Sequence, residues 1–200
     1  MLAVSFMGDA KAGAAGSGVG DVVGRVIEGN MPPMRHIIGI LLQNESGALS
    51  RVAGLFSSRG YNIESLSVSA TDDPILSRLT LVTQGSEGVV QQIVNQLHKL
   101  IDVVAVDDMT GEDHLERELA LLKVRVKPAL RDAVREKVAA AGGRILTDER
   151  DYLVVELTSS EVAINELARE LSRQGELLEV VRSGALAMSR QEPTLHIVEG

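Results

Sequence analysis

The chain has 200 residues, a formal net charge of −8, 44% hydrophobic residues, only 2% aromatic residues and no cysteine. This length allows one or two domains with a buried core of Val, Ile, Leu and Ala. The negative charge and the scarcity of rings argue against nucleic-acid binding, which needs cations and stacking platforms. The lack of cysteine excludes disulfides, thiolate metal sites and thiol nucleophiles, and it suits a reducing compartment.

Residues 1–34 differ in composition from the rest of the chain. They are rich in Gly and Ala with scattered acidic residues, which predicts a disordered tail. Met31 and Met34 stand just before the folded pattern, and each is a candidate start that the sequence does not distinguish from Met1. No apolar run follows a basic start, so we expect no secretory signal. No segment approaches the roughly 18 apolar residues that span a membrane, and we expect a cytoplasmic protein.

A first folded unit is predicted over residues 35–110. Residues 36–43 form an apolar strand, and residues 47–59 place Leu49, Val52 and Phe56 on one face of a helix. Ser46 is the expected N-cap of this helix, and Gly60 is expected to end it. The remaining elements are strands at residues 61–70 and 76–83, a helix at 87–99 and a strand at 101–106.

A second unit of similar pattern is predicted over residues 115–190, after an acidic linker at residues 107–113. A tail of residues 191–200 follows it. The elements of this unit are strands at residues 118–126, 144–148, 152–158 and 176–183, with helices at 129–141 and 160–173. Both units therefore read βαββαβ, which predicts an α+β protein of two tandem ferredoxin-like domains.

A ferredoxin-like unit has helices on one face of its sheet and a bare second face. We expect an equivalent sheet or helix from a second subunit to cover that face. The chain is therefore predicted to form a two-fold homodimer.

The loop from Gln43 to Gly47 lies where the first strand turns into the first helix. A helix beginning here presents free N–H groups and the positive end of its dipole, which suit a small carboxylate. The alternative is that Asn44, Ser46 and Gly47 form an ordinary turn and cap, with no ligand.

Several segments in this order resemble a known family: NESGALSRV, FSSRGYNIESL, TDDP with LSR, QLHKLIDVV, HLERELALLKV and LEVVRSGALAMSR. The first unit resembles an ACT domain, a ferredoxin-like module that senses amino acids. Residues 35–190 together resemble the small regulatory subunit of acetohydroxyacid synthase, also called acetolactate synthase. Residues 1–30 depart from that pattern, and residues 128–170 match it less closely.

This resemblance implies a non-catalytic chain with no cofactor of its own. It implies a large catalytic partner that uses thiamine diphosphate, Mg²⁺ and FAD, which the small subunit activates and makes sensitive to valine or another branched-chain amino acid. It also implies homodimerisation through ACT domains, with the effector between them. The matching positions for the effector are Asn44, Gly47, Ala48, Leu49, Asn62 and Ile63.

Histidines, paired aspartates and isolated arginines elsewhere in the chain have local explanations or open roles. The histidines His36, His98, His114 and His196 show no metal-ligand spacing. Asp72 and Asp73 precede Pro74 in what we interpret as a turn. Arg59, Arg78 and Arg182 fit either a partner interface or pairing with carboxylates, and the sequence does not separate these roles.

Two other functions compete with this regulatory role. The first is a stand-alone ACT-type amino-acid sensor that acts on another enzyme or regulates transcription; a transcription regulator needs a DNA-binding helix-turn-helix, and no segment with a basic recognition helix is left over. An acylphosphatase-like enzyme needs a phosphate-binding loop with a positioned arginine, whereas the first loop carries Glu45 and no cation.

Overall fold

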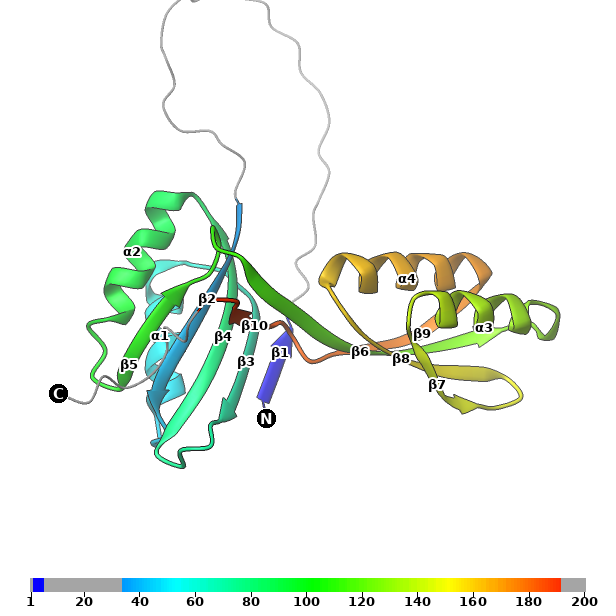
Figure 1. Cartoon of the computed structure of the whole chain (residues 1–200), viewed down its shortest axis with the longest axis horizontal. Coiled ribbons are helices and arrows are strands. Elements are labelled where there is room, and N and C mark those ends of the chain that lie inside the picture. Colours follow the sequence, from blue (N-terminus) through cyan, green and yellow to red (C-terminus); the bar gives the residue numbers. More distant parts are fainter. Residues whose placement is uncertain (1, 6–33, 192–200) are drawn as a thin grey trace, which may run out of the picture.

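The computed structural model describes residues 2–5, by their backbone only, and residues 34–191. Two antiparallel sheets stand side by side, and each packs two helices against one face (Figure 1). This arrangement confirms the predicted α+β fold of two tandem ferredoxin-like βαββαβ domains. Among the described residues, no helix has both the length and the apolar character needed to cross a bilayer.

The first domain has its strands in the order β3-β4-β2-β5, which is that of a split βαβ unit. Gly60 ends its first helix, as predicted, but Ser46 does not cap that helix. Gly47 occupies the N-cap position with φ of 91°, which leaves Ser46 one residue too early. The elements are β2 (Met34–Gln43), α1 (Ala48–Arg59), β3 (Ile63–Ala70), β4 (Leu76–Gly85), α2 (Glu87–Leu97) and β5 (Val103–Asp108).

The β3 edge of the first sheet carries a strand from the N-terminal segment. Strand β1 (Leu2–Ser5) pairs antiparallel with β3, from Leu2 opposite Val68 to Ser5 opposite Ser65. The prediction that residues 1–34 are wholly a disordered tail was therefore wrong for residues 2–5. The physical reason is that an edge strand presents unpaired N–H and C=O groups, which any short extended segment can satisfy. Residues 6–33 lie outside the described residues, while Met34 belongs to β2.

The second domain repeats this order as β7-β8-β6-β9. Its first strand begins at His114 rather than at residue 118, so it extends toward the first domain (Figure 1). The elements are β6 (His114–Val126), a 3₁₀ turn at Pro128–Leu130, α3 (Arg131–Ala140), β7 (Arg144–Asp148), β8 (Tyr152–Ser159), α4 (Glu161–Gln174) and β9 (Gly175–Arg182).

A final strand, β10 (Leu186–Ser189), was not predicted. It pairs antiparallel with the first residues of β6, so that β6 and β10 form a two-stranded ribbon beside the first sheet. Ala185, Ala187 and Met109 pack on Ile37 and Val82, which project from the sheet face opposite the helices. The expectation that a second subunit covers this face was therefore incomplete, because part of the cover comes from the same chain.

Each domain has an apolar core between its sheet and its helices. In the first domain, Ile38 and Leu79 of the sheet and Phe56 of α1 are at most 1% exposed. In the second, Leu122, Leu153 and Leu171 are fully buried. Burying each side chain of this size contributes about 1.5–3 kcal/mol, which is why Val, Ile and Leu suffice without many aromatic residues.

Candidate functional site

The loop after β2 places the start of α1 beside the start of β5, where the Gln43 N–H donates to the Asp102 carbonyl at 2.8 Å. Gly47 lies in the left-handed region, and the Ala48 N–H donates to the Glu45 carbonyl at 3.2 Å. The Ala48 side chain is buried in the core of the first domain, so it anchors the loop rather than facing a ligand. We find no protein acceptor for the N–H of Leu49 within the part of the chain that the structure describes. The first turn of a helix leaves such donors free, and they suit an anion.

Asn44 is already engaged within the chain. Its Nδ2 donates to the Pro74 carbonyl at 3.0 Å, and its Oδ1 accepts from Ser77 Oγ at 3.0 Å. Its backbone N–H donates to the Ile75 carbonyl at 2.8 Å. Asn44 therefore fastens the loop to the turn between β3 and β4.

A cation that the sequence analysis missed lies in this loop region. Arg51, in the first turn of α1, makes a two-pronged ion pair with the buried Asp102, including Nη2 to Oδ1 at 2.7 Å. A Cβ placed on Gly47 would lie 3.0 Å from Arg51 Nη1, so the loop backbone and this guanidinium are neighbours. The signal in the sequence was the spacing: Arg51 follows Gly47 by four residues, about one helical turn, which brings its side chain back to the loop.

The ion pair shifts the titration of both of its members. Hydrogen bonds from Arg51 hold the pKa of Asp102 below its usual value, and the carboxylate raises the pKa of Arg51. Because the pKa of Asp102 is lower in the folded chain than in the unfolded chain, this pair stabilises the fold above about pH 4. That stabilisation is lost as pH falls through the folded-state pKa.

We therefore expect Asp102→Asn to lower the melting temperature at neutral pH, with the deficit shrinking on acidification. Thermal unfolding followed by circular dichroism between pH 7 and pH 3, for the native and variant chains, measures this difference. The two curves should converge at the acid end. Curves that stay parallel would show that the Asp102 carboxylate contributes no pH-dependent stability.

Asn62 and Ile63 lie at the opposite end of the sheet from the loop. Ile63 is paired opposite Thr83, and Thr83 Oγ1 donates to the Asn62 carbonyl at 2.6 Å. Gln43, just before the loop, is paired opposite Leu76 at the other end of β4. The seven-residue separation of Leu76 and Thr83 corresponds to about 23 Å of strand. One chain thus holds the six predicted effector residues as two separate groups.

The end of the sheet that carries Asn62 meets the second domain. A cavity of about 670 Å³ opens there, lined by residues that include Asn62, Glu64 and Ala168. Arg35 of β2 donates to both carboxylate oxygens of Glu116 in β6, at 3.0 and 2.5 Å, and its Nε lies 3.0 Å from Glu161 of α4. Burial opposes the charge of Arg35, but the hydrogen bond to Glu116 and the nearby carboxylates outweigh it and raise the pKa of Arg35.

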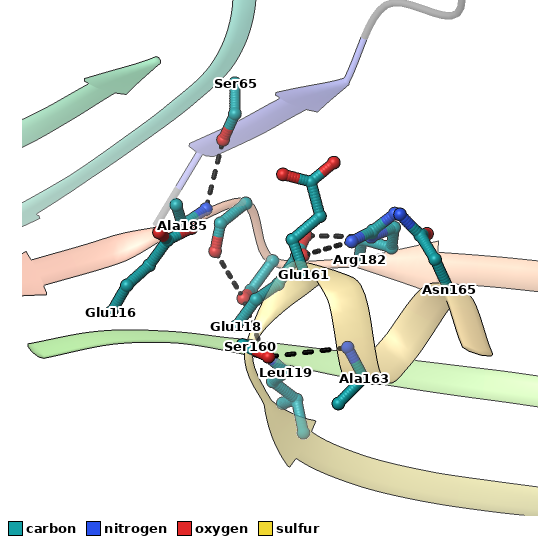
Figure 2. Close-up of polar contacts among 12 residues, drawn as sticks. Ser65, Glu116, Glu118, Leu119, Ser160, Glu161, Ala163, Asn165, Arg182 and Ala185 are labelled. Atoms are coloured by element: carbon teal, nitrogen blue, oxygen red, sulfur yellow. Dashed lines mark hydrogen bonds and ion pairs between the residues drawn. The ribbon is translucent and has the colours of Figure 1, made fainter. Parts of the chain in front are cut away.

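A second charged group belongs to the C-terminal domain and is drawn in Figure 2. Its members Glu118, Asn165 and Arg182 line the same cavity. Arg182 of β9 grips the buried Glu118 with two nitrogens, Nε to Oε1 measuring 3.0 Å, and its Nη1 donates to Asn165 Oδ1 at 3.0 Å. The sequence carried a signal for these acids. Glu116 and Glu118 share the alternation phase of Ala120 and Leu122, which marks them as inward-facing.

Next to the Glu118–Arg182 pair, the chain passes from β9 to β10 through a tight connection that packs against β3. The Ala185 N–H donates to Ser65 Oγ at 3.0 Å, and Ser67 Oγ donates to the Ser183 carbonyl at 2.8 Å (Figure 2 shows the first of these). Gly184 between them has φ of 77°. We call this connection the β3 clasp; it joins the C-terminal strand to the strand that begins beside Asn62.

The described residues include no cluster of His, Asp or Glu side chains that suits a metal ion. His36 binds Thr110 Oγ1 and the Gly85 carbonyl, and Asp73 closes the predicted turn through the Ile75 N–H. These groups serve local structure.

Comparison with known proteins agrees with both domains. Residues 38–105 match the family described as AHAS small subunit-like ACT domain, and residues 117–191 match the family described as small subunit of acetolactate synthase. The chain is 44% identical over 157 residues to the acetolactate synthase isozyme 3 small subunit of Escherichia coli K12, covering 78% of this chain and 96% of that protein.

The chain belongs to the family of acetolactate synthase small subunits. A second relative, the small subunit of Haemophilus influenzae, is 42% identical over 162 residues, covering 81% of this chain and 99% of that protein. The crystal structure of the acetolactate synthase small subunit from Thermotoga maritima superposes with a TM-score of 0.73 at 31% identity, covering 80% of this chain and 99% of that one. The chain is therefore a regulatory, non-catalytic subunit in branched-chain amino-acid biosynthesis.

Proposed function

We propose that this small subunit activates the catalytic large subunit of acetolactate synthase and confers feedback inhibition by valine or another branched-chain amino acid. The thiamine diphosphate, Mg²⁺ and FAD of the reaction belong, in this proposal, to the large subunit. The observation that carries the sensor role is the loop at the start of α1. There, the left-handed Gly47 precedes the Leu49 N–H, which has no acceptor among the described residues, and a Cβ on Gly47 would lie 3.0 Å from Arg51 Nη1.

In this proposal the effector site is shared between two copies of the chain. Because the loop group and the Asn62 group lie at opposite ends of the sheet, a two-fold pairing of antiparallel β3 edges would bring the loop end of one copy beside the Asn62 end of the other. Strand β1 pairs with that same edge, so the second copy would have to take its place. Self-association should then be stronger for a chain that begins at Met34.

The groups of the shared site divide the ligand between them. The carboxylate of the amino acid would receive the N–H groups of Gly47 and Leu49 at the helix start. The ammonium group would donate to the exposed side chain of Asn62, and Ile63 and Leu49 would contact the branched side chain. Asn44 and Ala48 would act indirectly, by holding the loop in shape.

We expect Asn62→Ala to raise the valine concentration needed for half-inhibition by about tenfold, because a hydrogen bond to a charged group is worth about 1.5–3 kcal/mol. Activation of the large subunit should persist. Acetolactate formation, measured with a valine titration, tests this expectation. Asn95→Ala, which changes an exposed asparagine on α2, is the control. Native sensitivity in the Asn62 variant would remove this residue from the effector site.

The function itself is tested by assaying the large subunit alone, with this chain, and with this chain plus valine. Activation that valine reverses is the expected result. Activation without a valine response would keep the partner and contradict the proposed effector. No activation would contradict the regulatory role and leave a stand-alone ACT sensor as the explanation of the loop.

A further inference from the structure

An apolar groove runs beside β10 across the uncovered part of the first sheet. It has a volume of about 460 Å³, and its lining includes Leu115, Leu186 and Met188 together with Arg78 and Arg117. None of the predicted effector residues lines it. The groove is therefore separate from the proposed amino-acid site.

Exposed apolar side chains continue from the groove along one face of β6 and its partners. Successive residues of a strand point to opposite faces, and Glu118 and Ala120 of β6 are buried on the inner face. On the outer face, Leu115 and Leu119 are each 38% exposed, and Val181, Leu186 and Met188 are at least 50% exposed.

This outer face, which we call the β6 strip, runs from Leu115 to Leu121 and thus spans about 20 Å. It is longer than a small metabolite, and an exposed apolar surface of this kind is typical of a protein–protein contact.

The groove also holds two arginines whose charge is not neutralised. Arg78 Nη2 donates to the Ala187 carbonyl at 3.2 Å, and Arg117 Nη1 donates to the Glu116 carbonyl at 2.7 Å. Among residues 34–191 neither guanidinium is in ion-pair contact with a carboxylate, unlike Arg35 and Arg182. In a chain of net charge −8, this makes the groove a local positive site next to apolar walls.

The two guanidinium charges indicate which kind of partner fits the groove. A two-fold contact centred on the groove would press the same patch of two copies together and bring four unpaired guanidiniums close to one another. Like charges in an interface cost several kcal/mol. The groove instead complements a different surface, one that offers apolar side chains with a carboxylate among them. Arginine and methionine are both enriched in such interfaces.

We propose that the groove and the β6 strip dock the catalytic large subunit, through a segment that places a carboxylate against Arg78 and Arg117 between apolar side chains. This inference rests on the proposed function for its partner and adds the surface and the chemistry of contact. Docking here spans both domains, because the first residues of β6 lie with β10 beside the first sheet and the rest of β6 pairs within the second.

The test is a titration of the chain into a fixed amount of large subunit, with acetolactate formation as the readout. Leu186→Asp should raise the concentration for half-maximal activation about tenfold or more, as expected for a buried apolar anchor. Leu146→Asp on β7 is the matched control, because both leucines are 51% exposed; its value should change less than about twofold. Arg117→Glu should weaken activation as strongly as Leu186→Asp, and high salt should weaken the native complex.

Leu186→Asp activating like the native chain would overturn the assignment, as would equal losses in Leu186→Asp and Leu146→Asp. Sedimentation of each variant alone tests the second-copy alternative: a dimer that Leu186→Asp dissociates would assign the groove to self-association and overturn docking. A native chain that fails to activate the large subunit at all contradicts the proposed function instead. Valine binding by Leu186→Asp, measured by calorimetry, should equal that of the native chain.

Discussion

Replacing Gly184 by alanine is expected to cost the chain about 2–4 kcal/mol of unfolding free energy. Two effects add. With φ of 77°, the residue lies where a Cβ is strained. In addition, a Cβ built there would lie 2.5 Å from Ser65 Oγ and 2.8 Å from Ser67 Oγ, the two side chains of the β3 clasp. Relief of that clash requires the two serine side chains to rotate and give up their hydrogen bonds to Ala185 and Ser183, or the connection to move away from β3.

Urea unfolding of Gly184→Ala and Gly142→Ala separates the two effects. Gly142 has the same φ of 77° but no atom within 4 Å of the added Cβ, so Gly142→Ala should cost only about 1 kcal/mol. Limited proteolysis should also cut Gly184→Ala, and not Gly142→Ala, near residues 183–191. Equal losses of stability in the two variants would show that the β3 clasp is not tightly packed.

Replacing Arg182 by alanine is expected to cost about 3 kcal/mol, since it leaves a buried carboxylate without its partner. Glu118 is 7% exposed and receives two nitrogens of Arg182 in the Glu118–Arg182 pair. The Asn165 side chain loses its donor as well. The cost arises mainly from the stranded charge, because the pair itself gains little over an apolar contact of the same volume.

Arg144→Ala is the matched control for Arg182→Ala. It also removes an arginine that is paired with a glutamate, Glu156, but the Arg144 side chain is 74% exposed. Its cost should be at most about 1 kcal/mol. The double variant Glu118→Leu with Arg182→Leu should recover more than half of the stability lost in Arg182→Ala. Urea unfolding measures all three variants. If the double variant were as unstable as Arg182→Ala, the stranded-charge explanation would be wrong.

The two glutamates of β6 show where sequence reasoning stopped. The alternation of β6 marks Glu116 and Glu118 as inward-facing, a signal that the sequence analysis missed, and nothing local to β6 names the arginines that accompany them. Glu116 pairs with Arg35, which lies 81 residues away, and Glu118 pairs with Arg182, 64 residues away. The first partner follows from how the two domains pack and the second from the pairing of β6 with β9, and hydrophobic periodicity within one element describes neither.

For the candidate effector residues, too, the sequence predicted the local structure but not how distant segments are placed. The loop from Gln43 to Gly47 was predicted as a turn before a helix, and its chemistry follows from helix geometry alone. That Asn62 lies at the far end of the sheet from this loop follows from strand order and register, which depend on pairing between distant segments. The engagement of Asn44 by Pro74 and Ser77 also arises from that pairing.

The sequence by itself determined the βαββαβ order of both units, the apolar faces of their helices and strands, and the family to which the chain belongs. The element order and the apolar faces are local properties, because periods of 3.6 and 2 residues select a helix or a strand within a few turns of chain. The family followed from its resemblance to ordered segments across residues 35–190. Only the tertiary structure decided that β10 and the start of β6 cover part of the first sheet, that Gly184 lies against Ser65, and that Arg78 and Arg117 remain uncompensated beside an apolar groove. Each of these depends on which surfaces of distant segments meet, and that choice is made by burial of the whole chain rather than by any one segment of it.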